Sequence, residues 1–457
     1  MKLLAEHALL PSGWARGVLI TITDGRIEQV EQRSTERFAE RVAGLVLPGM
    51  PNVHSHAFQR AMAGLAERRT HATDSFWTWR ELMYRFAARI TPAQMFDIAA
   101  WLYVEMLKAG YTSVAEFHYI HRDAQARPYS DPGEMSHRLI AAAGAAGIAL
   151  THLPVLYAYG GFGGRAPSEA QKRFVLSAEE YAALVSALSS RLERSRDARV
   201  GIAFHSLRAV DEALMRATLA AIEGLSAKSP IHIHVSEQQR EVEECLAATG
   251  KRPVEWLLDH FALGERWCLV HATHLDADEA RRLAESGAVA GLCPSTEANL
   301  GDGIFPMASF ASGTRAGRFA IGSDSHVSVS VAEELRLLEY GQRLAGGRRS
   351  ALATSAEPSP GQAMYVQAAI RGAQAVGLET GRIAPGHRAD LVVLDPAHRA
   401  LWNVGPEHAL DAWIFAGDSA CVRDVMVGGS WRVRDRRHER EDELAMRFRR
   451  AQAELVE

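Results

Sequence analysis

Two histidines separated by one residue, His54 and His56, are the first feature of the sequence with an evident chemical use. In an extended segment, residues two apart point to one face, while the residue between them points to the other. Both imidazoles can therefore approach one metal ion, and neutral imidazole is a common ligand of zinc. An isolated pair of this kind is more often a polar strand end, so its partners elsewhere in the chain decide its role.

Comparable groups of polar side chains follow several other short apolar runs. They are Glu116, His118, Tyr119 and His121 in "EFHYIH", His205 and Arg208 in "FHSLR", His232, His234 and Glu237 in "HIHVSE", His271 and His274 in "VHATH", and Asp324 and His326 in "GSDSH". Imidazoles with one carboxylate suit a borderline divalent ion, zinc first. Such an ion lowers the pKa of a bound water to about 7, and Asp324 could then both ligate the metal and accept the proton of that water.

The elements that must position these residues follow from the alternation of short apolar runs with helix-like segments. The eight runs are Leu45–Met50, Thr112–Phe117, Ile148–Leu156, Val200–Phe204, Pro230–Val235, Cys268–Val270, Ala288–Leu292 and Phe319–Gly322. Between them lie segments such as 91–110, which opens with Thr91 and Pro92 as cap and first helical residue. The pattern predicts an α/β fold, a parallel (β/α)8 barrel of the TIM type. Its reactive residues should gather at the carboxyl ends of the strands, where the polar groups lie.

The two ends of the chain have a different pattern. Residues 1–47 and 385–436 contain short β-like runs and the hairpin-turn sequences "TDGR" and "VGGS". We expect them to form one small β-sandwich-like domain beside a barrel of residues 48–384. Residues 437–457 are expected to form a C-terminal amphipathic helix.

Composition excludes several classes of function. The 51 basic and 55 acidic residues give a net charge of −4, which provides no electrostatic basis for binding nucleic acid or an anionic membrane. The four cysteines show no C-x-x-C spacing, which fits a reducing cytoplasm. Neither the interrupted N-terminal run "MKLLAEHALL" nor the glycine- and proline-broken stretch 139–164 predicts a signal peptide or a membrane span. We expect a cytoplasmic homodimer, although no motif specifies the oligomeric state.

The motifs "PGMPNVHSHAFQ", "HIHVSE", "LVHATHL" and "GSDSH", in this order, resemble the amidohydrolase superfamily. The tail "GRIAPGHRADLVVLD" is similar to that superfamily's signature at the return to the small β domain, so the resemblance covers nearly the whole chain. It implies that the metal ligands are His54, His56, His234 and Asp324. It further implies that His271 orients or polarises the attacking water, and that Glu237 is the proton-shuttling glutamate of the aminohydrolase branch.

The resemblance also bears on the number of metal ions. Members with two ions bridge them by a carboxylated lysine, usually after the fourth strand. The corresponding region here, "VGIAFHSLRAV", contains no lysine, and Lys108, Lys172, Lys228 and Lys251 fall inside a helix or between strands. One Zn²⁺ per chain is therefore expected, as in deaminases and related aminohydrolases.

Two arginines, Arg80 and Arg208, predict a substrate with carboxylates, which arginine binds through paired hydrogen bonds. Gln59, Tyr119 and His205 add neutral hydrogen-bonding groups, although packing roles for these three, and a helix-surface position for Arg80, stay open. "PNVHSHAFQRAMAGLAE" with "FWTWRELMY" is similar to the formimidoylglutamate deiminases of one histidine-degradation route. That likeness implies hydrolysis of N-formimino-L-glutamate to N-formyl-L-glutamate and ammonia. Asp324, assisted by His271, would take the proton of the zinc-activated water, and Glu237 would help move a proton to the leaving nitrogen.

Two alternatives remain at this point. One is a neighbouring aminohydrolase that acts on guanine, an adenosine derivative or a chlorotriazine. The other is a metal-free barrel that only binds its ligand, which normally requires a missing metal ligand. We expect His232 to be a buried, hydrogen-bonded histidine, and His118, His121, His274 and His326 to have supporting or surface roles.

Overall fold

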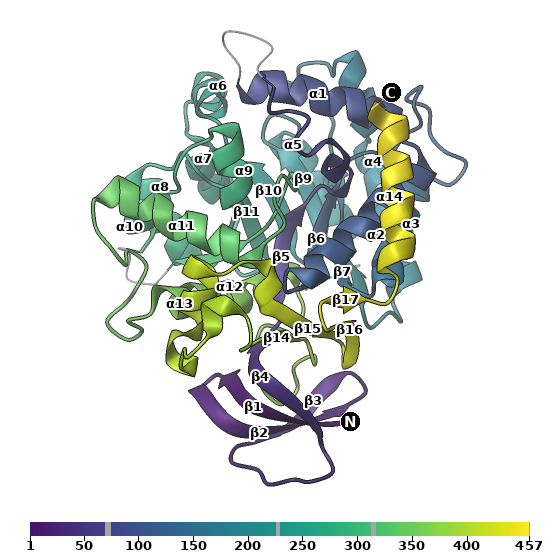
Figure 1. Ribbon diagram of the computed structural model, residues 1–457. Coiled ribbons are helices and arrows are strands. Elements are labelled where there is room, and N and C mark those ends of the chain that lie inside the picture. The colour runs from purple at the N-terminus through teal and green to yellow at the C-terminus, as the bar shows by residue number, and fades with distance from the viewer. Residues whose placement is uncertain (69–74, 225–228, 312–316, 457) are drawn as a thin grey trace.

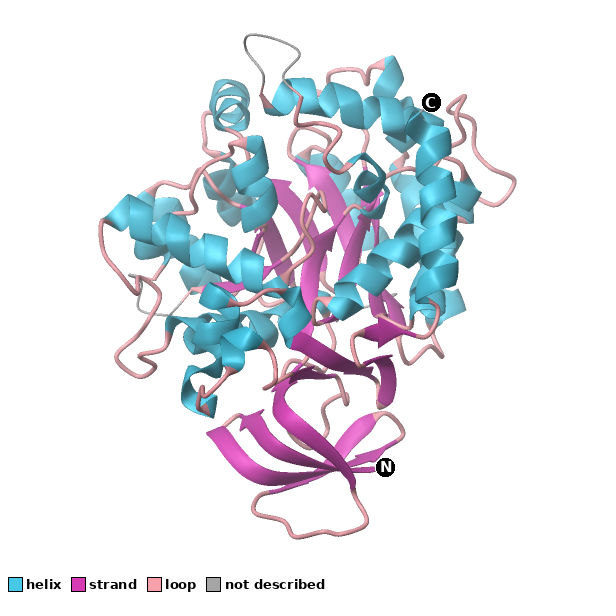
Figure 2. Cartoon of the chain, viewed as in Figure 1, coloured by secondary structure: helices cyan, strands magenta, loops and turns pink. Residues whose placement is uncertain are grey.

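The computed structural model describes residues 1–68, 75–224, 229–311 and 317–456. Two sheets organise them. A large parallel sheet is surrounded by helices, and a smaller sheet formed by both ends of the chain lies beneath it in Figures 1 and 2. None of the helices in the described ranges is both long and apolar enough to cross a membrane.

The large sheet is a nearly closed parallel barrel whose neighbouring strands follow chain order. Its strands are β5 (Met50–Ser55), β6 (Tyr111–His118), β7 (Ala149–Leu156), β9 (Ile202–Ser206), β10 (Ile231–Val235), β11 (Trp267–His271), β12 (Val289–Leu292) and β13 (Arg318–Ile321), with the short β8 (Ala198–Val200) paired to β7. A parallel bridge between Ser55 and Asp324 joins the first strand to the chain just after the last. The predicted eight-stranded α/β barrel is confirmed.

Helices cover the outside of the barrel and its mouth (Figure 1). They are η1 (Ala57–Met62), α1 (Phe76–Arg89), α2 (Pro92–Lys108), α3 (Glu134–Ala146), η2 (Glu169–Phe174), α4 (Ala178–Leu192), α5 (Glu212–Ile222), α6 (Gln239–Thr249), α7 (Pro253–His260), α8 (Ala277–Ser286), α9 (Pro294–Leu300), α10 (Met307–Phe310), α11 (Val331–Gly346), α12 (Pro360–Val376), η3 (Arg399–Leu401), α13 (Pro406–Ala416), η4 (Ser419–Cys421) and α14 (Glu441–Val456). As predicted, α2 begins after Thr91, whose hydroxyl accepts from the Gln94 N–H while the Gln94 side chain accepts from the Thr91 N–H.

The small sheet joins the two ends of the chain, as the turn sequences predict. It contains β1 (Lys2–Leu10), β2 (Gly13–Thr23), β3 (Arg26–Glu31), β4 (Glu40–Pro48), β14 (Leu391–Leu394), β15 (Val422–Val427), β16 (Ser430–Arg434) and β17 (Arg437–His438). Strand β4 pairs in parallel with β1 and antiparallel with β14, so it links the N-terminal strands to the C-terminal ones. The terminal helix α14 lies along α2, where Arg447 pairs with Asp97 at 2.6 Å.

The first barrel strand begins later than the sequence pattern predicts. Leu45–Pro48, the start of the run predicted as a barrel strand, pairs instead with β14 in the small sheet. The barrel strand β5 begins at Met50, one residue past Gly49, where an added Cβ would lie 2.2 Å from the Thr112 hydroxyl oxygen. Both strands are buried where they meet and no polar residue separates them, so hydropathy does not reveal where the chain leaves one sheet for the other. In consequence His54 lies within the strand, and His56 lies one residue past its end.

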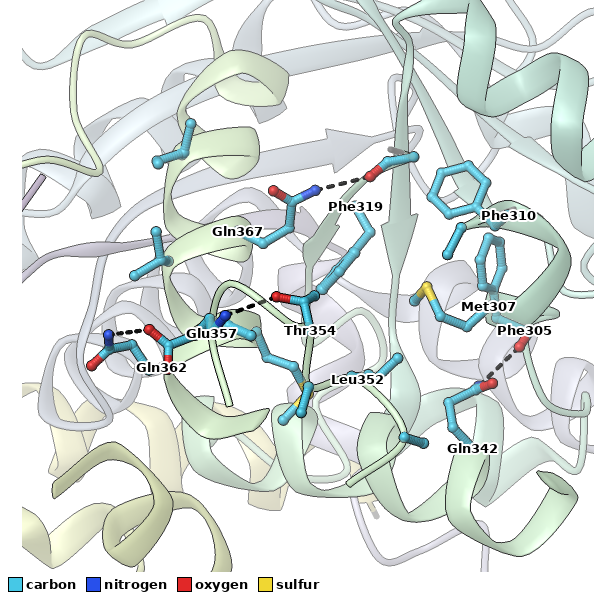
Figure 3. A pocket seen from close by; sticks show the side chains of 18 of the residues that line it. Phe305, Met307, Phe310, Phe319, Gln342, Leu352, Thr354, Glu357, Gln362 and Gln367 are labelled. Atoms are coloured by element: carbon cyan, nitrogen blue, oxygen red, sulfur yellow. Dashed lines mark hydrogen bonds between the residues drawn. The ribbon is translucent and has the colours of Figure 1, made fainter. Parts of the chain in front are cut away.

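A cavity of about 1170 Å³ lies beside the amino end of β13, away from the polar groups that follow the strands. Figure 3 shows its apolar lining, which includes Phe305, Met307, Phe310, Phe319 and Leu352. Two polar side chains of its lining are hydrogen-bonded locally: Gln367 donates to the Gly317 carbonyl and Gln342 to the Phe305 carbonyl, each at 2.9 Å. Among the described residues, none that lines this cavity belongs to a group of side chains that could hold a metal ion.

Candidate active site

Three histidine nitrogens and one carboxylate oxygen converge where the barrel strands end. The Nε2 atoms of His54, His56 and His234 lie 2.9–3.3 Å from one another. Asp324 Oδ1 lies 3.4 Å from the Nε2 atoms of both His54 and His56. All four side chains are buried, and His54, His56 and His234 fulfil the geometric requirements for holding a metal ion.

The hydrogen bonds of these histidines decide whether a cation fits between them. His56 Nδ1 donates to the Phe117 carbonyl and His234 Nδ1 to the His205 carbonyl, each at 2.9 Å. A carbonyl only accepts, so these protons reside on Nδ1, and both Nε2 atoms present lone pairs to each other. Burial lowers the pKa of all three imidazoles and keeps them neutral. Facing lone pairs attract a cation, so the residues present fit a metal ion.

Two residues at the point where these side chains converge, Asp324 and His271, have strained backbone conformations. Asp324 and His271 adopt left-handed conformations, with φ of 46° and 66°, which non-glycine residues rarely occupy. The Asp324 N–H donates to the His54 carbonyl at 3.0 Å, and the His56 N–H donates to the Asp324 carbonyl at 3.1 Å. These two bonds hold the segment that follows β13 against the end of β5.

His271 lies among three carboxylates. Its Nε2 is 3.8 Å from Glu237 Oε1 and 3.8 Å from Asp324 Oδ2, and its Nδ1 is 3.3 Å from Glu297 Oε1. Burial alone would lower the pKa of His271, but these carboxylates outweigh burial and raise that pKa to about 10. Burial raises the pKa of Glu237 to about 7, against the opposing effect of His271 and Arg208. Groups that can hold and release a proton therefore lie directly beside the proposed ligands.

A single cavity brings together the side chains that the sequence assigns to the substrate. Gln59, Arg80, Tyr119, His205 and Arg208 all line it. Its lining also includes His56, His234, Glu237, His271 and Asp324, with an aromatic wall of Phe76, Trp79, Tyr84, Tyr157 and Phe174. None of the lining residues in the described part of the chain is a lysine.

The two arginines reach this cavity from different elements. Arg208, after β9, has a nearly buried side chain whose Nη2 lies 3.8 Å from Glu241 Oε2. Arg80, on α1, stacks on Trp77 with its guanidinium carbon 4.4 Å from the ring centroid, and Arg240 of α6 lies 4.5 Å over that same ring. Positive charge therefore borders a cavity whose floor carries the imidazoles.

The neutral groups between the arginines and the floor are hydrogen-bonded. Gln59 Nε2 donates to the Tyr119 hydroxyl at 3.1 Å. Burial, with the nearby Arg208, lowers the pKa of His205 well below its usual value, so this imidazole is neutral. As predicted, His232 is not part of the cavity: it is buried and its Nε2 donates to the Ala375 carbonyl at 2.8 Å.

Several residues of this site were not predicted from the sequence, and two of them have side chains with a polar function. Glu297, on α9, contacts His271, and Tyr157, directly after β7, lines the cavity. Both follow apolar runs that were recognised as strands, in "CPSTE" and "VLYAY". Both lie where the fold places reactive groups, after the third and seventh strands of the barrel, so their positions after these strands are the signal that points to them.

Comparison with known proteins agrees with this geometry. The model of the Amidohydrolase family matches residues 45–432, and that of the "Formimidoylglutamate deiminase HutF, N-terminal domain" matches residues 3–41. A formimidoylglutamate deiminase of Pseudomonas aeruginosa is 52% identical over 456 residues, covering 100% of this chain and 99% of that protein. An 8-oxoguanine deaminase of the same organism is 29% identical over 438 residues, covering 91% of this chain and 89% of that protein.

Solved structures show the same fold. An amidohydrolase from Brucella melitensis has a TM-score of 0.94 and 46% sequence identity, with full coverage of both chains. An adenosine deaminase from Xanthomonas campestris with bound zinc has a TM-score of 0.82 at 20% identity, covering 100% of this chain and 98% of that one. From the family match over most of its length and the relative aligned end to end, this chain belongs to the amidohydrolase family.

Proposed function

We propose that this protein hydrolyses N-formimino-L-glutamate to N-formyl-L-glutamate and ammonia in histidine degradation. The observation that carries the proposal is one cavity with a metal-ligand set at its floor and two arginines, Arg80 and Arg208, in its wall. An amidine carbon suits the first feature, and the two carboxylates of the substrate suit the second. The end-to-end likeness to a protein named formimidoylglutamate deiminase supports the same substrate.

The proposed metal is one Zn²⁺ per chain, held by His54, His56, His234 and Asp324. Neutral imidazoles with a carboxylate are a typical zinc donor set, and the lone pairs of His56 and His234 already face each other. When bound, zinc would supply a water acidic enough to react near neutral pH. The absence of lysine from the described lining supports a single ion rather than a lysine-bridged pair.

The chain's own residues would then move the protons. Asp324 accepts a proton from the attacking water, and His271, beside it, orients that water toward the formimino carbon. The water oxygen bonds to this carbon, and Glu237 helps deliver a proton to the nitrogen that leaves. The C–N bond breaks, ammonia departs, and the water oxygen becomes the formyl oxygen. General acid–base assistance of this kind contributes roughly 10²–10⁴-fold.

Gln59, Tyr119 and His205 are the proposed neutral contacts of the substrate, and Arg80 and Arg208 the proposed contacts of its carboxylates. Because all five line the cavity beside Glu237 and His271, they can orient the formimino head over the floor. The homodimer and the cytoplasmic location stay predictions. Light scattering of the purified protein tests the first of them.

Ammonia release from N-formimino-L-glutamate tests the function. We expect turnover by the zinc-loaded protein, loss of turnover after chelation, and recovery when zinc is restored. N-formiminoglycine, which lacks the side-chain carboxylate, should react with a much lower kcat/KM. Faster release of ammonia from guanine or an adenosine derivative than from N-formimino-L-glutamate would contradict the proposed substrate.

A further inference from the structure

One buried carboxylate holds both neighbours of His56. Glu116, on β6, is 2% exposed and is absent from the cavity lining. Its Oε1 accepts from the Ala57 N–H at 2.8 Å, and its Oε2 accepts from the Ser55 hydroxyl at 2.5 Å. Tyr103 donates to the same Oε2 at 3.2 Å. The residues before and after His56 are therefore both attached to the neighbouring strand through a single side chain.

The same hydrogen bonds continue to the segment that carries Asp324. His326 Nε2 lies 3.1 Å from the Ser55 oxygen, and His326 Nδ1 lies 3.0 Å from the Ser323 oxygen. The Asn52 amide donates to that Ser323 oxygen at 2.6 Å.

The direction of this series is fixed by its donors. An amide nitrogen only donates, so the Ser323 hydroxyl accepts a hydrogen bond from Asn52 and donates one to His326 Nδ1. His326 then donates from Nε2 to Ser55, and Ser55 donates to Glu116. Each serine hydroxyl in this series donates one hydrogen bond and accepts another. The proton of neutral His326 is therefore on Nε2.

The series crosses the least bonded boundary of the barrel. Within the described residues, the end of β5 meets the chain after β13 through one bridge, Ser55 to Asp324. The fit there is close, since a Cβ added at Gly322 would lie 2.8 Å from the His54 nitrogen. His54 and His56 lie on one side of this boundary and Asp324 on the other. The spacing of three of the four proposed ligands therefore depends on how the boundary is held.

We propose that Glu116 is a positioning residue of the metal centre: through Ser55 and His326 it sets the separation of His54 and His56 from Asp324. The inference rests on the proposed ligand set. A carboxylate accepts from all three donors at once. The glutamine of Glu116→Gln has one acceptor oxygen, and its NH2 group would face either the Ala57 N–H or the Ser55 hydroxyl. The second arrangement reverses the series and requires the other tautomer of His326.

Zinc affinity, measured by competition with a chromogenic chelator, tests the inference. Supporting residues of metal ligands typically contribute about 10–100-fold in affinity, so we expect a Kd for zinc raised by that factor in Glu116→Gln. The matched control is Glu339→Gln. Glu339 is equally buried and accepts from Arg343 and the N–H groups of Ala351 and Leu352 at 2.7–2.9 Å, but it lies on α11 outside the cavity. The control should lower apo-protein stability without changing the Kd for zinc.

A second variant and a spectroscopic measurement complete the design. Ser55→Ala removes one hydroxyl, should fold, and should weaken zinc binding in the same direction. With Co²⁺ in place of zinc, both variants should shift the ligand-field absorption bands, and Glu339→Gln should not. Wild-type zinc affinity and wild-type Co²⁺ spectra in Ser55→Ala would overturn the inference, and so would an equal loss of affinity in Glu339→Gln. If instead His56→Ala retained one tightly bound zinc, the proposed ligand set itself would fail.

Discussion

His56 and His271 have the same side chain, but their surroundings give them opposite protonation states: His56 is neutral and His271 is protonated. His56 donates from Nδ1 to a carbonyl, and burial keeps it neutral, so its Nε2 lone pair is available to a metal. His271 is as buried, but three carboxylates keep its proton in place. The difference comes from residues distant in the sequence, which explains why histidine spacing alone distinguished a ligand pair from a polar strand end only weakly.

Asp324→Asn tests the proton-accepting role of this carboxylate. The amide oxygen can still ligate zinc, but it no longer accepts a proton from the attacking water. With bound zinc verified by metal analysis, we expect kcat to fall by roughly 10²–10⁴-fold. Full turnover by the zinc-loaded variant would contradict the proposed role.

Glu297→Gln tests the control of His271. Removing one of the three carboxylates removes part of the field that stabilises the imidazolium, so the pKa of His271 should fall. We expect kcat to drop by about 10–100-fold with zinc content unchanged. The pKa is measured by NMR titration of the histidine resonances in the metal-free protein. An unchanged His271 titration would show that Glu297 does not act on this imidazole.

At the scale of elements, the strands and their order could be predicted, but their exact ends could not. The apolar runs located seven of the eight barrel strands, because strands buried on both faces are nearly continuous in hydrophobicity. The first run failed at Gly49, where two buried strands of different sheets follow each other without a polar break. The proposed ligand set came from the resemblance of the ordered motifs to the amidohydrolase superfamily. Glu116 and Glu297 lie at or after the ends of barrel strands, where polar groups are expected, but the contacts that they make with other elements do not follow from the sequence.

Trp77 connects two helices at the cavity mouth, and its removal tests how Arg80 is placed. Its ring lies between Arg80 of α1 and Arg240 of α6. Such a contact contributes about 0.5–1 kcal/mol at an exposed position, so loss of the Arg80 contact in Trp77→Ala should raise KM by roughly two- to fivefold, with kcat nearly unchanged. Steady-state kinetics on N-formimino-L-glutamate measure both constants. The control is Trp402→Ala, at an exposed tryptophan outside the cavity, which should leave KM as it is.

At the scale of the whole molecule, the fold buries many histidines in their neutral form. His152, on β7, is fully buried, and neither ring nitrogen has a hydrogen-bond partner among the described residues. Burial lowers its pKa to about 3. The unfolded chain binds a proton at this histidine below about pH 6.5, whereas the folded protein does not until about pH 3. Keeping His152 neutral therefore costs no stability above about pH 6.5. As pH falls from there toward 3, this histidine lowers the free energy of unfolding progressively.

His152→Leu should remove this part of the acid sensitivity. At pH 7 the substitution should change stability little, because no hydrogen bond is lost. At pH 4.5 the variant should exceed the wild type by about 3 kcal/mol in its free energy of unfolding, since two pKa units correspond to about that amount. Urea unfolding of the metal-free proteins at both pH values measures this. The exposed His408→Leu is the control, and an equal pH dependence in the wild type and His152→Leu would refute the expectation.

The bridge between Ser55 and Asp324 sets a limit on when the four proposed metal ligands can come together during synthesis. His54 and His56 leave the ribosome early, whereas Asp324 and His326 emerge only after seven further barrel strands have been translated. The N-terminal strands likewise wait for β14, which pairs with β4 near the end of the chain. No nascent chain that ends before Asp324 contains all four proposed ligands, so we expect the four-ligand site to form only after the last barrel strand has been translated.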